Sequence, residues 1–199
     1  MLYLYIICVC SLIIILINKL LFSNILSLNI FQIILLTFIC VIVQIIVDLI
    51  LALIARRCLP SKWFGVNNQL FSAKPKERIF YERIGIKDWK DKVLELGALS
   101  GFRKNKIKEP KNNDYIEKYI LEANFGVMVH IFCIVFGFLI AFIFPKQYFI
   151  SFCLPVSFVN AILNILPLFV LRYNLPKLFM IYKLNNKQSI KKQKTENVA

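Results

Sequence analysis

The stretch IFQIILLTFICVIVQIIVDLILALIA, residues 30–55, decides the fold of this chain. It carries Gln32, Gln44 and Asp48 among apolar residues, and it exceeds the roughly 20 residues that an α-helix needs to cross a bilayer. A segment of this length crosses with some tilt. It therefore predicts a membrane-spanning helix with a few polar side chains inside it.

Three further apolar segments, Leu2–Phe22, Val127–Phe144 and Tyr148–Leu171, have a similar length. The last of them contains helix-breaking and polar residues, which membrane helices tolerate where neighbouring helices satisfy the backbone. These residues are Pro155, Asn160, Asn164 and Pro167. The four segments predict an all-α integral membrane protein with about four transmembrane helices.

The overall composition supports the same class of protein. The chain has 199 residues, 59% hydrophobic and 18% charged, with a formal net charge of +14 and a mean hydropathy of +0.68. Such a composition excludes an ordinary water-soluble domain and an acidic disordered chain. The basic residues lie just outside the apolar segments, so membrane lipid is the expected partner and nucleic acid is not.

The charge distribution predicts the topology and four regions. Residues 56–126 hold 16 basic and 9 acidic side chains, and residues 172–199 hold 7 and 1. Because basic residues flank membrane helices on the cytoplasmic side, both regions and both termini are expected in the cytoplasm, with the protein in the cell membrane. Residues 1–55 and 127–171 then form two helix pairs, and the polar end of the tail, residues 185–199, is expected to be disordered.

Two features of the sequence argue against a cleaved signal peptide and against a site built from cysteines. No basic n-region precedes the first segment and no small-residue cleavage site follows it, so a membrane helix is expected there rather than a cleaved signal peptide. The six cysteines form no CxxC pair and no His/Cys cluster, so neither a metal site nor a disulfide framework is expected.

The region between the second and third segments shows helical periodicity. Apolar residues recur over Lys76–Leu96 with an interruption at Gly85, which predicts two short amphipathic helices, the second ending near Gly97. Trp89 is expected at the headgroup layer. This pair of helices is either a structural hairpin or a floor that holds a lipid or cofactor headgroup, and periodicity alone favours the structural interpretation.

The pattern Asp114-Tyr115-Ile116-Glu117 resembles a capping box and predicts that a helix begins near Asp114 and continues into the third crossing. Glu122 and His130 then lie roughly 12 Å apart along one helix and about 80° apart around it, so they do not touch. Both are expected to face a cavity at the cytoplasmic interface. His130 and Asp48 are ionisable groups at membrane depth, which makes them functional candidates; the alternative is that each bonds a neighbouring helix.

Several motifs along residues 60–183 resemble the ordered landmarks of the glycosyl-4,4′-diaponeurosporenoate acyltransferase family. The most specific is the Arg-Tyr-Asn-x-Pro-basic-Leu run, because it follows an apolar segment as it does in the family. The landmarks are Trp89-Lys90-Asp91-Lys92-Val93-Leu94 with Gly97, Glu122 with His130, Asn164 before Pro167, and Arg172 to Leu178.

The resemblance implies a membrane-embedded acyltransferase that moves a fatty acyl group onto a glucose hydroxyl of a glycosylated carotenoid, the last step of staphyloxanthin-type synthesis. It implies an acyl thioester as co-substrate and no bound cofactor. Histidine is a suitable base for the hydroxyl proton, so His130 and Glu122 are the expected catalytic residues. Residues expected to bind substrate or to stabilise the oxyanion are Arg172, Asn174, Asn164, Asn160, Trp89 and Lys90.

The sequence also departs from the family pattern. Where the family reads Thr-x-Arg-Ala-Glu before its histidine, this chain has Ala123, Phe125, Gly126 and Val127, and Ile131 replaces a usual tryptophan. Two functions from different classes stay open: acyl transfer to a glycosylated carotenoid or related glycolipid, and a non-enzymatic membrane assembly partner that keeps the family fold.

The basic tail has its own interpretation. Its lysines are expected to anchor the chain on anionic lipid, whereas Arg172 abuts the membrane and is expected to hold a phosphate or carboxylate with its guanidinium fork. The lysines of the tail are Lys177, Lys183, Lys187, Lys191, Lys192 and Lys194.

The predicted topology is tested by cysteine accessibility in a background without native cysteines. Single cysteines placed near Lys104 and near Lys192 should both be labelled only from the cytoplasmic side, and one near Asn24 only from outside. Labelling of the first two positions from opposite sides contradicts the four-crossing topology.

Overall fold

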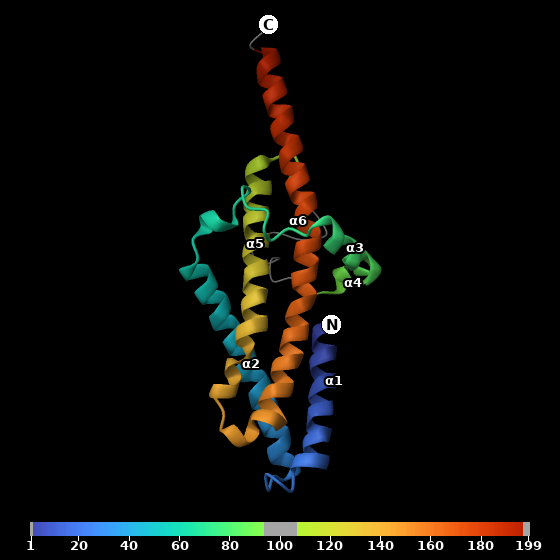
Figure 1. The fold of residues 1–199 in the computed structure, drawn as a ribbon, viewed down its shortest axis with the longest axis vertical. Coiled ribbons are helices and arrows are strands. Elements are labelled where there is room, and N and C mark those ends of the chain that lie inside the picture. Colours follow the sequence, from blue (N-terminus) through green and yellow to red (C-terminus); the bar gives the residue numbers. More distant parts are fainter. Residues whose placement is uncertain (1, 94–106, 197–199) are drawn as a thin grey trace. The chain divides into compact units, whose positions relative to one another are not determined.

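The computed structural model describes residues 2–93 and 107–196, and all regular secondary structure within these ranges is helical (Figure 1). Gly97, the predicted end of the second amphipathic helix, lies outside the described residues. The chain divides into two compact units. The first unit comprises residues 1–57, 92–94 and 129–166, and the second comprises residues 58–91, 95–128 and 167–199.

Four helical segments are long and apolar enough to cross a membrane, which confirms the predicted fold class. They are Tyr3–Phe22, Ile30–Cys58, Asn113–Phe142 and Lys146–Ile190. The four long α-helices of these segments are α1 (Leu2–Ile17), α2 (Ile30–Cys58), α5 (Asn113–Phe136) and α6 (Leu154–Glu196).

The core of the first unit lies where its chain reverses direction. Two π-helical turns, Asn18–Phe22 and Phe149–Cys153, occur at these reversals. The buried amide of Asn18 donates to the carbonyl oxygen of Ile14 at 2.9 Å and to that of Ser151 at 2.7 Å. One side chain thus satisfies a carbonyl on each of two segments that are far apart in the sequence.

The second unit is built around stacked aromatic rings. The buried Phe64, at the end of a 3₁₀ turn (Ser61–Phe64), stacks on Phe125 of α5 with ring centroids 4.0 Å apart and on Phe71 at 5.4 Å. The buried Asn124 amide donates to the carbonyl oxygen of Phe64 at 2.7 Å. These contacts hold the segment after α2 against α5.

The amphipathic stretch forms two short helices, as its periodicity predicts: α3 (Pro75–Arg83) and α4 (Ile86–Trp89). Gly85 separates them with a φ of 66°, a left-handed conformation that glycine adopts at no steric cost. The indole of Trp89 donates to the carbonyl oxygen of Ile84 at 3.0 Å, across this turn. The ring therefore helps to close the turn between the two helices, and its predicted headgroup position stays a prediction.

The start of α5 agrees with the prediction, but its capping residue differs. Asn112, rather than Asp114, accepts the backbone N–H of Tyr115 on its side-chain oxygen, at 3.2 Å. Its backbone carbonyl accepts the first helical bond, from Ile116, at 3.1 Å. Asn112 is thus the N-cap, and Asp114 is already inside the first turn, where its negative charge favours the helix N-terminus.

The tail is helical as far as Glu196, so the predicted disorder is wrong for residues 185–196; residues 197–199 lie outside the described part. Tertiary hydrogen bonds explain the difference. The Asn185 amide donates to the carbonyl oxygen of Pro110 at 2.8 Å, and the Asn113 amide donates to Asn186. These bonds to the start of α5 add stability that composition alone does not supply.

Two prolines inside α6 create acceptors that other segments use. A proline has no N–H, so it leaves the carbonyl four residues earlier without its helical partner. Pro167 frees the carbonyl of Leu163, which accepts the Tyr3 hydroxyl of α1 at 3.0 Å. Pro176 frees the carbonyl of Arg172, which accepts the backbone N–H of Ala73 at 3.1 Å.

Tyr3→Phe should lower the free energy of unfolding by about 1–2 kcal/mol, because it leaves the Leu163 carbonyl without a donor. Pro167→Ala restores the missing helical N–H, so Tyr3→Phe should lower the free energy of unfolding by a smaller amount in a Pro167→Ala background than in the wild-type protein. Denaturant unfolding of the detergent-solubilised protein measures the free energy of unfolding of the two single variants and the double variant. If Tyr3→Phe costs the same with and without Pro167→Ala, the freed carbonyl does not explain the contact.

Candidate functional site

Several polar residues of the first unit's membrane helices form a network around Asp48 of α2. Its Oδ1 accepts the Asn160 amide at 3.1 Å and the Gln44 amide at 3.3 Å, and its Oδ2 accepts the Asn164 amide at 3.0 Å. Gln44 lies one turn before Asp48, and Asn160 and Asn164 lie one turn apart on α6. Three N–H donors therefore converge on one carboxylate in an apolar surrounding, which satisfies an acceptor that is costly to bury alone.

His130 of α5 joins this network through Asn164. Its Nδ1 lies 2.8 Å from Oδ1 of Asn164. Because the Asn164 nitrogen donates to Asp48, the oxygen of the same amide must face the histidine as an acceptor. Nδ1 therefore carries the proton, and Nε2 keeps its lone pair.

The orientation of Asn164 is fixed on its other side as well. Its amide nitrogen lies 3.1 Å from both the backbone oxygen and the side-chain oxygen of Asn160. Asn164 is 8% exposed, Asn160 9% and Gln44 3%. Burial and several acceptors around its N–H group together hold the amide in one orientation, and this orientation determines the tautomer of His130.

Gly137 leaves the space that the network needs. A Cβ at this position would lie 2.7 Å from the Asn160 amide nitrogen and 3.1 Å from that of Gln44. Gly137 begins the 3₁₀ segment that follows α5, Gly137–Phe142. The glycine allows this backbone to approach the two amides that donate to Asp48.

The predicted site residues separate into the two units. The structure brings His130 and Asn164 into direct contact and adds Asp48 and Asn160. Glu122 lies half-buried on α5 in the second unit, eight residues before His130, and none of the hydrogen bonds given above involves it. Its predicted catalytic role has no support from the geometry of the network and stays a prediction.

Arg172 of α6 lies in the second unit and binds a protein carboxylate. Its Nε lies 2.6 Å from Glu77 Oε1, and its Nη2 lies 2.7 Å from Oε2. The Tyr81 hydroxyl also donates to Glu77. The guanidinium beside it, with this hydroxyl, lowers the pKa of Glu77 to about 2. The fork that was expected to hold a substrate anion is thus occupied by α3.

Lys90, another motif residue of the second unit, lies near the ring of Tyr173. The hydroxyl of Tyr173 donates to Glu82 at 3.2 Å, and the ammonium of Lys90 lies 5.9 Å from the centre of the tyrosine ring. This hydroxyl and the nearby Lys87 ammonium lower the pKa of Glu82. Asn174, predicted to bind substrate, is half-buried on α6 in the same unit.

Sequence reasoning gave no role in the site to Gln44, Gly137 and Glu77. A signal for the first was present, because Gln44 and Asp48 repeat at i, i+4 in one apolar helix as Asn160 and Asn164 do in another. Two such pairs predict facing polar surfaces. Nothing local in the sequence pairs Glu77 with Arg172, which lies 95 residues away.

The fold and the site define a class: a helical membrane protein in which buried amides join a half-buried histidine and a half-buried carboxylate among the spanning helices. The family model described as glycosyl-4,4′-diaponeurosporenoate acyltransferase matches residues 60–184 of the chain. The protein belongs to this acyltransferase family. No curated protein and no solved structure matches the chain significantly.

The Glu77–Arg172 pair predicts a pH dependence of stability. The pKa of Glu77 is lower in the folded protein than in the unfolded chain, so the pair stabilises the fold above about pH 4.3 and this contribution is lost as the pH falls toward 2. Glu77→Gln should therefore cost about 1.5–3 kcal/mol at pH 6 and much less near pH 2.5.

Thermal unfolding at the two pH values measures this difference. Glu117→Gln, which removes an exposed carboxylate of α5, is the control for the loss of one negative charge. A Glu77→Gln effect that is equal at both pH values contradicts the assignment.

Proposed function

We propose that the protein transfers a fatty acyl group from an acyl thioester to a sugar hydroxyl of a glycosylated carotenoid or related glycolipid, the last step of staphyloxanthin-type synthesis. The family assignment supports acyl transfer in carotenoid synthesis. The sugar hydroxyl as acceptor and the thioester as donor go beyond the family assignment and are proposed here. The reaction takes place in the cell membrane, with both termini in the cytoplasm.

His130 is the general base of the proposed reaction. Its Nε2 accepts the proton of the sugar hydroxyl as the hydroxyl oxygen attacks the thioester carbonyl carbon. The tetrahedral intermediate collapses with cleavage of the carbon–sulfur bond, and the imidazolium returns the proton to the leaving thiolate. The products are an ester and a free thiol, so no other reactant is consumed.

One observation carries this proposal: Asn164 accepts the Nδ1 proton of His130 at 2.8 Å while it donates to Asp48 at 3.0 Å. Within the described residues, Nε2 of His130 makes no hydrogen bond that would occupy its lone pair. The amide and the carboxylate thus have the orienting role that the third member of a catalytic triad has elsewhere. The negative charge of Asp48 also stabilises the imidazolium that forms during transfer.

The decisive substitution is Asp48→Asn. The new amide presents a donor where the carboxylate only accepts, so Asn164 can reverse its amide and offer N–H to the histidine. The opposite tautomer then places the proton on Nε2 and removes the base. Turnover should fall by up to roughly 10⁴-fold, the loss seen when a triad carboxylate becomes an amide, and His130→Ala should lower turnover by roughly 10²- to 10⁴-fold.

Acyl transfer per folded molecule is the measurement, with the proportion of folded protein determined separately. Thr37→Val is the matched control, because Thr37 is a buried polar residue of α2 whose hydroxyl donates to the Ile33 carbonyl of the same helix, at 2.8 Å. It should keep normal turnover. If His130→Ala and Asp48→Asn also keep normal turnover per folded molecule, the histidine only bonds helices together, and the non-enzymatic assembly partner becomes the better interpretation.

A further inference from the structure

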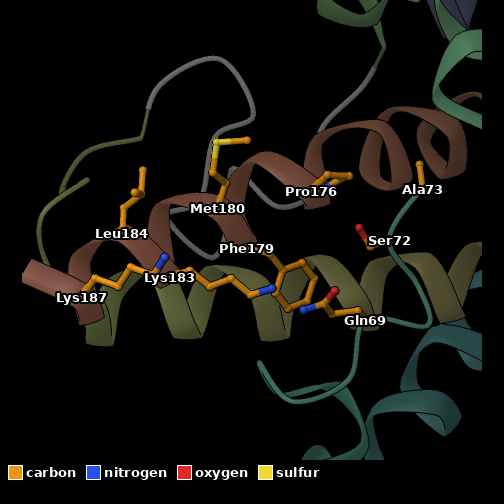
Figure 2. Close-up of a pocket in the computed structure, with 9 residues that line it drawn as sticks. All are labelled: Gln69, Ser72, Ala73, Pro176, Phe179, Met180, Lys183, Leu184 and Lys187. Atoms are coloured by element: carbon orange, nitrogen blue, oxygen red, sulfur yellow. The ribbon is translucent and has the colours of Figure 1, made fainter. Parts of the chain in front are cut away.

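A hollow in the second unit has not been assigned a role. It has a volume of about 420 Å³, within the usual range of small-molecule sites. One side is α6, and the other is the segment before α3 that carries Gln69 and Ser72 (Figure 2). The hydrogen bond from Ala73 N–H to the Arg172 carbonyl fixes this segment against α6.

The hollow is positively charged. Lys183 and Lys187 lie one turn apart on α6, and both line it. No acidic side chain is among its described lining residues, and neither lysine makes an ion pair within the described part of the chain. Two like charges at i, i+4 destabilise a helix, so an anion between them relieves a repulsion as well as forming new bonds.

Polar groups that donate hydrogen bonds lie across from the lysines. A turn in which Ser72 N–H donates to the Gln69 carbonyl at 3.1 Å brings the side chains of both residues to the hollow. Figure 2 shows Gln69 and Ser72 on this segment and the two lysines along α6. An amide, a hydroxyl and two ammonium groups are a suitable donor set for phosphate oxygens.

The hollow also has an apolar side. Phe179 is buried in it, whereas Met180 and Leu184 are 57% and 51% exposed. Large apolar side chains next to exposed lysines are suited to an amphiphilic ligand, since the charged end binds the ammonium groups and the apolar part covers the neighbouring surface.

We propose that this hollow binds a phosphate ester joined to an acyl chain, and that this ligand is the acyl donor, a thioester of the coenzyme A type. Anionic phospholipid offers the same chemistry, a phosphate beside acyl chains, and is the other possible source. Phosphate binding follows from the hollow itself, whereas the identification of the ligand as the donor rests on the proposed function.

Direct binding of S-hexadecyl coenzyme A tests the proposal, because this thioether cannot transfer its chain. The full-length protein is placed in phosphatidylcholine nanodiscs, and the Kd is measured. The double variant Lys183→Gln/Lys187→Gln should raise the Kd roughly tenfold. Lys111→Gln/Lys118→Gln removes two exposed lysines of the same unit that do not line the hollow, and it should leave the Kd unchanged.

A second arm separates the two sources of phosphate. Wild-type protein and the double variant are compared for phosphatidylglycerol retained after purification from mixed-lipid nanodiscs. A loss of thioether binding supports the donor. A loss of phosphatidylglycerol alone supports phosphate binding but overturns the donor as ligand. If the hollow variant equals the Lys111/Lys118 control in both arms, the proposal is overturned.

Binding at the hollow is measured separately from the proposed reaction. His130→Ala should lower transfer by roughly 10²- to 10⁴-fold and retain normal thioether binding, because His130 does not line the hollow. If the wild-type protein binds the thioether through Lys183 and Lys187 but transfers no acyl group, the proposed function and the identification of the ligand as the donor are both contradicted, whereas phosphate-ester binding at the hollow stands.

Discussion

Every backbone and side-chain polar group inside the spanning helices needs a partner from the protein itself, and the structure depends on this constraint. The prolines of α6 make it visible. Each one removes a donor from the helix, and the carbonyl that it frees becomes an attachment point: Leu163 for Tyr3 in one unit and Arg172 for Ala73 in the other. Residues that weaken an isolated helix thus fix neighbouring segments at defined positions along it.

The same constraint shapes the network around Asp48. A buried carboxylate needs donors, and amides supply them from Gln44, Asn160 and Asn164 without adding a second charge. An amide has an accepting oxygen as well as a donating nitrogen. Because the Asn164 nitrogen donates to the Asp48 carboxylate, the Asn164 oxygen faces His130 and accepts the proton of Nδ1. The hydrogen bonds that satisfy the carboxylate therefore also determine which histidine nitrogen carries the proton.

The membrane segments were predictable because about 20 apolar residues in a row have few alternatives to a spanning helix. The break at Gly85 and the start of α5 were predictable because a glycine that interrupts a helical pattern and a capping sequence are local signals. The helical structure of the tail was not predictable, because Asn185 and Asn186 form hydrogen bonds with residues about 75 positions earlier in the chain. The polar composition of the tail indicates only that its side chains favour water.

In the candidate site too, the sequence indicates which residues are unusual, but contacts between residues far apart in the chain are seen only in the structure. His130, Asn164 and Asp48 stand out as polar residues in apolar segments, but only the structure shows their direction of bonding. The occupation of Arg172 by Glu77 was not predictable, because many acidic residues of the central region were possible partners. Gly137 carries no local signal at all, since its role is the space it leaves beside Asn160 and Gln44.

Arg172 holds both ends of one short segment: its carbonyl binds Ala73, and its guanidinium binds Glu77. This has a consequence for the order of assembly during synthesis. Residues 73–77 leave the ribosome almost a hundred residues before Arg172, so the segment has no docking point until the last spanning helix has formed. The central region therefore completes its fold only after α6 is in the membrane, and a chain interrupted before residue 172 leaves the carboxylate of Glu77 without its guanidinium partner.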